Sequence, residues 1–366
     1  MELALKHVNS LPARTWNRLG INEAQLQETI ARLSSYGRDV IQGALPAGVS
    51  ASRQAFPLPQ LATGMGVEAA DFVSSNRTSG VSLRVAAGTR IAQPVFLSWR
   101  LDGAGPAVAD ENSVVAEEGS EITVVMSYSS DAALSGGFHG GLTRLYAAKG
   151  AVIHLIQVQM LGDGCVGFDD IGAFAEDGAK IGVVQAELGG REAFAGCRAR
   201  LDGAASSLSL DAIYFGDRSR SVDINYVAEH AGRKTRSEIH ISGALLDESR
   251  KNFRGTIDFL RGAKRAVGHE SEFNLLFSPK VRSRTAPLIL CAEEDVEGQH
   301  AASTGKIDEN RMFYLMSRGL SELDAKKLLI EAQFRPVTDR IPDEKLKDEV
   351  SDYVKARLNG LESLSR

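Results

Sequence analysis

The chain has 366 residues, of which 43% are hydrophobic and only 6% aromatic, with 36 glycines against 10 prolines. A chain of this length removes about 75% of its extended surface from water on folding, which excludes disorder, collagen and a disulfide-held miniprotein. The formal net charge of −5, without a long basic run, argues against nucleic acid as the main ligand. No window approaches the ~18 apolar residues of a membrane span, and the first residues lack the pattern of a signal peptide. We therefore expect a cytoplasmic protein that does not attach to membranes.

Residues 1–65 are predicted to form an N-terminal helical region followed by a linker. Asn22, with Gln25 three residues later, is typical of a helix N-terminus. Leu26 and Ile30 then fall near one helical face. The second half of the region is rich in small residues, proline and glycine, and this composition predicts a linker.

Residues 66–305 contain short alternations of apolar and polar residues and no long helical face, so we predict mainly strand. A glycine followed by a small residue recurs just before these alternations, at Gly88, Gly119, Gly150, Gly178 and Gly203. The spacings are 31, 31, 28 and 25 residues. A regular return of turn and strand, with too little helix for βαβ units, predicts a parallel β-helix whose coils share one core. A glycine-rich antiparallel sandwich is the alternative that periodicity leaves open.

Residues 306–366 predict a module of three helices. The first ends at Gly319, since glycine is the usual residue past a helix C-terminus. The second begins at Ser321, which forms a capping pattern with Asp324 three residues later. The third follows Pro342.

The sequence lacks the common phosphate-binding, nucleophile-elbow and zinc-protease motifs, which argues against the common catalytic classes. The cysteines are odd in number and far apart, which argues against a disulfide framework or a closed zinc site: Cys165, Cys197 and Cys291. The stretch from Cys291 to His300 nevertheless holds one thiol, four carboxylates and one imidazole, a mixture that suits iron, zinc or copper. If it begins with a strand over residues 291–296, Cys291 shares a face with two of the acids and His300 lies in the following turn. Alternatively, Cys291 is a small core residue, the acids form a solvated edge and His300 is structural.

Several short motifs occur in an order and at separations that resemble those of one protein family. They are His230–Ser237, Gly243–Arg250, Phe253–Ile257, Asn274–Ser278, Glu294–Val296 and Phe313–Gly319. Together they are similar to the SufB/SufD family of iron–sulfur cluster assembly proteins. The resemblance implies a right-handed parallel β-helix flanked by helical termini. It also implies a SufB-like partner paired through the β-helix and an ABC-type ATPase, SufC, docked on the C-terminal helices, with the ATPase activity residing in SufC.

The same resemblance implies which residues matter. His300 matches the family histidine near which a nascent cluster forms at the subunit interface, and it is our candidate metal ligand. A cysteine of SufB-type members is Val281 here, the glutamate after their histidine is Ala301, and a cysteine of some SufD members is Gly298. The chain therefore resembles a SufD-type subunit that holds no cofactor stably by itself, although a transient iron–sulfur cluster is implied in the complex.

The resemblance places SufC docking on the first two C-terminal helices. The candidate docking residues are Phe313, Tyr314, Arg318, Leu328 and Leu329. Two other functions remain open at this point. One is a self-sufficient homodimeric scaffold of the same type, and the other is a polysaccharide lyase or hydrolase, because such β-helix enzymes assemble their sites from adjacent coils.

Overall fold

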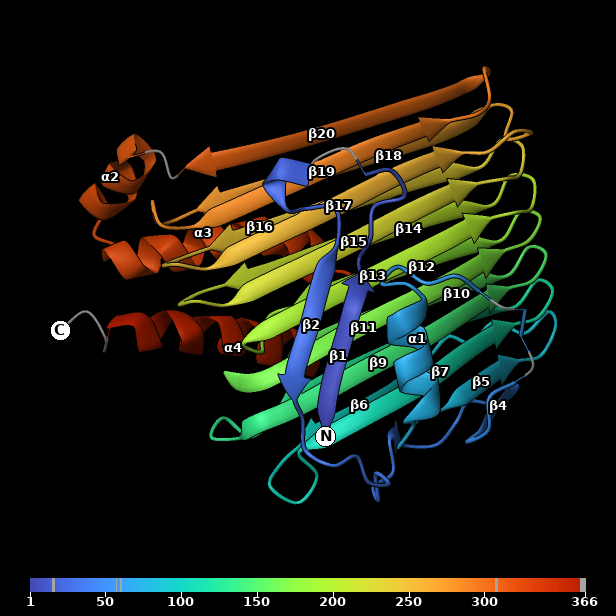
Figure 1. The fold of residues 1–366 in the computed structure, drawn as a ribbon, viewed down its shortest axis with the longest axis horizontal. Helices are drawn as coiled ribbons and strands as arrows, with labels where there is room; N and C mark the ends of the chain where they lie inside the picture. The colour runs from blue at the N-terminus through green and yellow to red at the C-terminus, as the bar shows by residue number, and fades with distance from the viewer. Residues whose placement is uncertain (15–16, 57, 60, 307–308, 363–366) are drawn as a thin grey trace.

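The computed structural model describes residues 1–14, 17–56, 58–59, 61–306 and 309–362, and its centre is a solenoid of two facing sheets (Figure 1). The sheet that we call the even sheet contains β3 (Ile41–Gln42), β6 (Val95–Leu101), β8 (Glu121–Ser130), β10 (Val152–Met160), β12 (Lys180–Glu187), β14 (Ser207–Gly216), β16 (Arg236–Leu245), β18 (Ala266–Leu276) and β20 (Val296–Lys306). The odd sheet contains β4 (Val49–Ser52), β5 (Ser82–Val85), β7 (Ala107–Ala116), β9 (Ser135–Ala147), β11 (Gly164–Ala175), β13 (Glu192–Leu201), β15 (Ser221–His230), β17 (Arg250–Phe259) and β19 (Arg282–Cys291).

From β5 onward, consecutive strands alternate between the two sheets, and neighbours within each sheet run parallel. Such an arrangement is a parallel β-solenoid. The predicted β-helix is therefore confirmed, and the antiparallel sandwich is wrong.

The turns that lead from the odd sheet into the even sheet stack into one column, visible as the loops at the right of Figure 1. One residue in each turn has a positive φ, and its N–H donates to a carbonyl of the next turn at 2.5 to 2.9 Å. These residues are Gly88, Gly119, Gly150, Gly178, Ala205, Lys234 and Arg265. The repeat is thus marked by turn residues in the left-handed conformation, which are spaced by 31, 31, 28, 27, 29 and 31 residues along the chain. Gly203 lies in the same turn as Ala205 but is not one of these left-handed residues. A Cβ added to Gly203 would lie 1.9 Å from the nitrogen of Asp177, so close packing of neighbouring turns requires glycine there.

The inward faces of the two sheets form one elongated core. Ile122, Ile153 and Ile181 are partners on β8, β10 and β12, and none is more than 2% exposed. Aliphatic side chains stacked in this way fill the narrow interior at crystal-like density and leave room for few rings. The low aromatic content of the chain follows from this packing.

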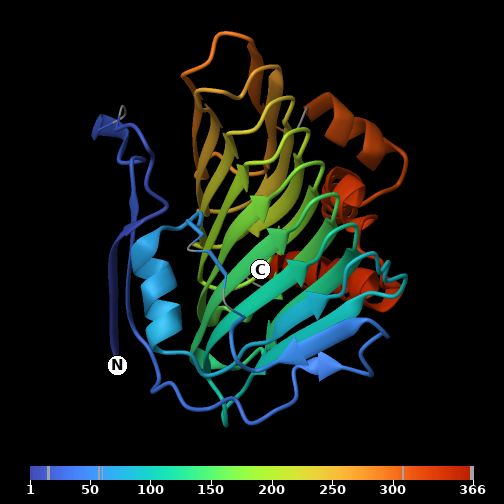
Figure 2. The ribbon, with the colours of Figure 1, turned by 90° about the vertical axis from the view of Figure 1, so that its right-hand side faces the viewer.

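A layer formed by N-terminal residues covers the outer face of the odd sheet (Figure 2). The helix predicted to begin at Asn22 is wrong, because the segment forms a strand paired antiparallel with the start of the chain. Leu26 and Ile30 are both buried, and an i, i+4 spacing keeps side chains on one face of a strand as well as of a helix. Among the described residues of 1–65, the only helical element is the 3-10 turn η1 (Asn17–Leu19). The layer consists of β1 (Glu2–Val8), β2 (Ala24–Thr29) and the helix α1 (Val67–Ser75).

Three helices follow the last strand, as predicted, namely α2 (Glu309–Ser317), α3 (Glu322–Thr338) and α4 (Glu344–Glu362). The side chain of Ser321 accepts a hydrogen bond from the Asp324 N–H at 3.1 Å and so caps α3. Helices α3 and α4 cover the outer face of the even sheet, where Ile330 and Val354 share a cluster with Phe215. Within the described part of the chain, no helix is long and apolar enough to cross a membrane.

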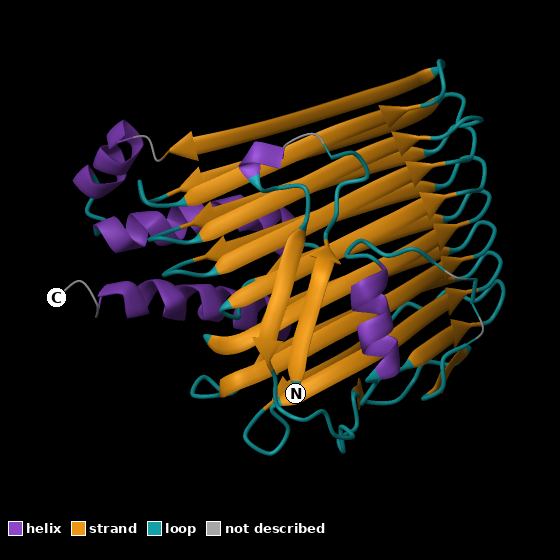
Figure 3. Ribbon diagram, in the orientation of Figure 1, coloured by secondary structure: helices purple, strands orange, loops and turns teal. Residues whose placement is uncertain are grey.

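The two ends of the solenoid differ (Figure 3). At the end that we call the capped end, β3 and β4 add to the sheets in antiparallel fashion, and Tyr36 and Leu45 pack on the core. At the other end, which we call the open end, β20 is exposed from Glu297 to Thr304. Its outer edge has no strand partner among the described residues. The inner face and the backbone edge of the last coil therefore lie at the surface.

Candidate functional site

His300 lies on β20 at the open end, on the face that points into the solenoid. Its Cα partner on the strand below is the buried Glu270, and two residues earlier Gly298 faces Ile289 of the opposite sheet. The imidazole is exposed and has no hydrogen-bond or ion-pair partner within the described part of the chain. The structure thus presents the predicted histidine at the rim of the interior with its nitrogens free.

Directly below this rim, Glu270 is a buried carboxylate that the sequence reasoning missed. It is 4% exposed, and its Oε2 atom has no hydrogen-bond partner. Burial, followed by the nearby Glu272 carboxylate, raises the pKa of Glu270 to about 8. Gly255 of β17 faces it, and a Cβ added to this glycine would lie 2.1 Å from Oε2. The carboxylate therefore occupies space that exists only because residue 255 has no side chain.

Glu272, two residues further along β18, has an entirely different environment. Lys251, 1% exposed, forms an ion pair with its Oε1 atom, and the Thr285 hydroxyl donates to Oε2 at 2.5 Å. Tyr214 adds a hydrogen bond from its hydroxyl to Oε1 at 3.2 Å. Burial lowers the pKa of Lys251, and the ion pair with Glu272 opposes this effect. Glu272 is thus neutralised and fully hydrogen-bonded, whereas its neighbour Glu270 is not.

The alternation of Glu270 and Glu272 along β18 was the signal that could have revealed both residues. Alternating polar residues usually mark the solvent face of a strand. Here the residues on either side of Glu270, His269 and Ser271, face outward, and His269 lies against Glu238 at 3.1 Å. The interior of the last coils is therefore polar, which composition alone does not indicate.

The cysteines do not supply a site in this chain. Cys165 and Cys197 are buried, and burial raises the pKa of both thiols, which disfavours the thiolate that binds metals. Cys291 is exposed at the end of β19, with its Sγ donating to the Glu293 carbonyl at 2.9 Å. The alternative that Cys291 is a core residue is therefore wrong, and so is a strand over residues 291–296, because β19 ends at Cys291 and β20 begins at Val296.

The acidic residues after Cys291 form the last turn of the solenoid. Glu293 accepts a hydrogen bond from the Gly262 N–H at 2.9 Å, and this bond lowers the pKa of its carboxyl group. Asp295 lies 3.7 Å from Arg265 of the turn below. Among the described residues, no group of three histidine, cysteine or acidic side chains could hold a metal ion.

The candidate docking residues lie mostly at the surface of α2 and α3. Phe313 is 73% exposed, Tyr314 is 55% exposed, and Leu328 is 47% exposed, whereas Leu329 is half-buried. The Arg318 guanidinium lies over the Tyr314 ring, 5.3 Å from its centroid. Phe313, Tyr314 and Leu328 thus leave large apolar side chains exposed to water on two adjacent helices.

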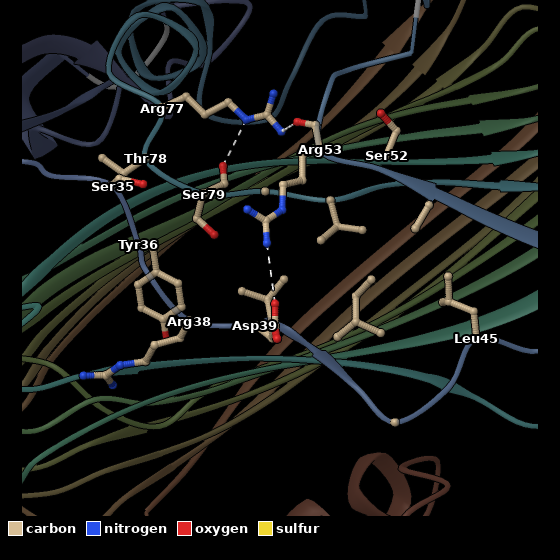
Figure 4. Close-up of a pocket in the computed structure, with 16 residues that line it drawn as sticks. Ser35, Tyr36, Arg38, Asp39, Leu45, Ser52, Arg53, Arg77, Thr78 and Ser79 are labelled. Carbon is tan, nitrogen blue, oxygen red and sulfur yellow. Dashed lines mark hydrogen bonds and ion pairs between the residues drawn. The ribbon is translucent and has the colours of Figure 1, made fainter.

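A pocket of about 740 Å³ lies at the capped end (Figure 4). Arg53 and Arg77 line it, but both guanidinium groups already have partners. Arg77 donates to the Ser79 carbonyl at 3.0 Å, and Arg53 lies 3.5 Å from Asp39. These arginines fasten the capping segment to the first coil, and we assign the pocket no ligand.

Taken together, the two facing parallel sheets and the uncovered last strand define a β-solenoid with one open end. The model for the SufBD core domain of SUF system FeS cluster assembly matches residues 99–333. This match covers more than half of the sequence, and the chain belongs to the SufBD family.

The curated relatives are distant in sequence. A chloroplastic SufBD family protein of Arabidopsis thaliana is 26% identical over 280 residues, which is 74% of this chain and 50% of the relative. A SufBD family protein of Pyrococcus horikoshii is 26% identical over 278 residues, or 72% of this chain and 59% of the relative. SufD of Escherichia coli is 29% identical over 162 residues, covering 44% of this chain and 38% of that protein. The chain thus spans about half the length of the curated relatives it matches, and the match gives no support to a polysaccharide lyase or hydrolase.

Proposed function

We propose that this chain is a SufD-like scaffold subunit of iron–sulfur cluster assembly that acts in the cytoplasm and performs no catalysis itself. It pairs with a SufB-like chain through the open end of its solenoid. The observation that carries the proposal is the free imidazole of His300 on an exposed edge strand, where a second chain can extend the sheet. One neutral histidine cannot hold a cluster alone, so the thiolates come from the partner and the cluster is transient.

The absence of a thiol beside His300 supports the SufD-like assignment over a SufB-like one. At position 298, an added Cβ would lie 3.0 Å from the Phe259 ring and 3.3 Å from Ile289. Glycine fits this packed position, and a cysteine would have to displace its neighbours. The position of the SufB-type cysteine is Val281 here, and this apolar side chain packs against the main core cluster.

A SufC-like ATPase docks, in this proposal, on the exposed apolar surface of α2 and α3. Phe313, Tyr314 and Leu328 supply that surface, with Arg318 at its side. ATP binding and hydrolysis then belong to the partner, which agrees with the lack of a phosphate-binding loop in this sequence.

The central experiment is co-expression of the chain with SufB and SufC, in wild-type form and with His300→Ala. We expect the variant to assemble normally but to retain less iron and sulfide, because the exposed side chain contributes nothing to folding. Iron and acid-labile sulfide are measured on the purified complex. An unchanged cluster yield would remove His300 from the site. A purified dimer of this chain alone that binds cluster would favour the homodimeric alternative.

Docking of the ATPase is tested with Leu328→Asp, which the structure favours over Leu329→Asp because Leu328 is exposed. Leu19→Asp is the matched control, since Leu19 is 53% exposed in η1, outside the C-terminal helices. We expect Leu328→Asp to capture less SufC in a pull-down and Leu19→Asp to capture the normal amount. Circular dichroism verifies that both variants fold. Normal capture by a folded Leu328→Asp variant would mean that the interface lies elsewhere.

A further inference from the structure

The unpartnered carboxylate of Glu270 requires an explanation. Buried polar groups in native structures nearly always have a hydrogen-bond partner, and one without a partner destabilises the folded state. Glu272, on the same strand and also buried, has partners for both oxygens, so of these two carboxyl groups only that of Glu270 has an unsatisfied oxygen. The unsatisfied group points to something that the isolated chain does not contain.

The surroundings of Glu270 lead toward the open end. Gly255 leaves the space that the carboxylate occupies, and the next coil places Pro287 above Gly255 and His300 above Glu270. Parallel neighbours lie about 4.8 Å apart, so a carboxylate and an imidazole on adjacent strands and on the same face can reach one ion. Proline has no N–H and fills little of the interior.

We propose that Glu270 and His300 together bind one ferrous ion, the metal substrate of cluster assembly, with the carboxylate from within the solenoid and the imidazole from its rim. This inference rests on the proposed function. Imidazole and carboxylate suit iron, and the two donors leave its other positions to thiolates or sulfide from the partner subunit. Glu272 is not available for this role, because Lys251 and Thr285 already occupy its oxygens.

The test uses the co-purified complex under anaerobic conditions, titrated with ferrous ion alone. Glu270→Gln keeps the size of the side chain and its fit over Gly255. Glu297→Gln is the matched control, because Glu297 lies on the same edge strand as His300 but points outward, where it lies 3.6 Å from His269. The readouts are the ferrous dissociation constant and the absorption spectrum of cobalt(II) bound in its place, which reports the ligand set independently of cluster yield.

We expect Glu270→Gln and His300→Ala each to weaken ferrous binding by about tenfold or more, on the scale seen for lost metal-site partners. The double variant should lose little more than either single variant, because both donors serve one ion. Glu297→Gln should bind iron like the wild type. Should Glu270→Gln fold poorly, Glu270→Asp retains a carboxylate one methylene shorter and should bind with intermediate affinity.

The two proposals fail in different ways. Wild-type ferrous affinity and an unchanged cobalt spectrum in Glu270→Gln, in a complex that still assembles, would overturn the role of Glu270 and leave the scaffold function intact. A failure of the wild-type chain to co-purify with SufB and SufC would instead overturn the proposed function.

Discussion

The capped and open ends of the solenoid are built from the same repeating unit but are finished in opposite ways. At the capped end, antiparallel strands and the segment that carries Tyr36 and Leu45 close the core. At the open end, the last coil leaves Ile289 37% exposed and the whole inner face of β20 accessible. A solenoid needs a cap wherever its core would otherwise meet water.

The open end leaves the edge strand β20 uncovered, in agreement with the interface that we propose there. Its interior is polar, since Lys251, Glu270 and Glu272 stand below the rim. A polar interior lowers the cost of leaving this end uncovered in the free chain. Of these three residues, only Glu270 has an oxygen without a partner, and it is the one that we propose as a ligand.

The largest expected effect comes from truncating one aliphatic side chain at each end of the solenoid to alanine, which removes three carbon atoms in each case. Leu83 on β5 is fully buried, so Leu83→Ala should lower the free energy of unfolding by about 3 kcal/mol, the middle of the range for buried leucines. Ile289→Ala should cost about 1 kcal/mol or less in the free chain, because its side chain is partly solvated already. Denaturant unfolding of both variants measures the difference. Equal costs would mean that the open end is packed as tightly as the capped end.

The contrast between the two ends was only half predictable from the sequence. Turn glycines such as Gly119 and Gly150 predicted the solenoid, because their left-handed conformation recurs once per coil. Ala205 and Lys234 adopt the same conformation without being glycine, so the glycine pattern in the sequence no longer marks the coils near the open end. The position of His300 followed from family resemblance, whereas Glu270 became visible only when the strand register placed it below the imidazole.

The N-terminal hairpin was not predictable in the same way. Leu26 and Ile30 fit a helical face as well as a strand face, and pairing with residues of β1 decided between them. Such pairing depends on contacts between distant segments, which a local pattern does not contain.

The covering layer over the odd sheet gives the second prediction, which concerns pH. Asp170 of β11 is buried and accepts a hydrogen bond from the Met65 N–H at 2.8 Å. Burial raises its pKa to about 7, with this hydrogen bond opposing the effect. Because the folded state holds the proton more tightly than the unfolded state, the group costs least stability below pH 4, and the cost grows as the pH rises to about 7.

Asp170→Asn, which removes the charge and keeps the acceptor oxygen, should therefore stabilise the protein more at pH 8 than at pH 5. The expected difference is about 2 kcal/mol, because one pK unit corresponds to about 1.4 kcal/mol and only part of the shift falls in this window. Thermal or denaturant unfolding at both pH values measures it. A gain that is the same at both pH values would show that Asp170 is already neutral, or already charged, throughout the window.

The smallest expected effect distinguishes the turns near the capped end from those near the open end. Gly150 has φ 65° and nothing within 4 Å of an added Cβ, so Gly150→Ala adds only backbone strain. We expect a loss of about 1 kcal/mol, since the left-handed region costs non-glycine residues roughly 1–2 kcal/mol and alanine recovers part of this by restricting the unfolded chain. Lys234 has φ 58°, and Lys234→Gly should change stability by less than about 0.5 kcal/mol, because relief of strain and the entropy of glycine nearly cancel. Denaturant unfolding of both variants decides the point: a loss on Lys234→Gly as large as that on Gly150→Ala would mean that the side chains of the open-end turns, and not their backbone conformation, hold the column together.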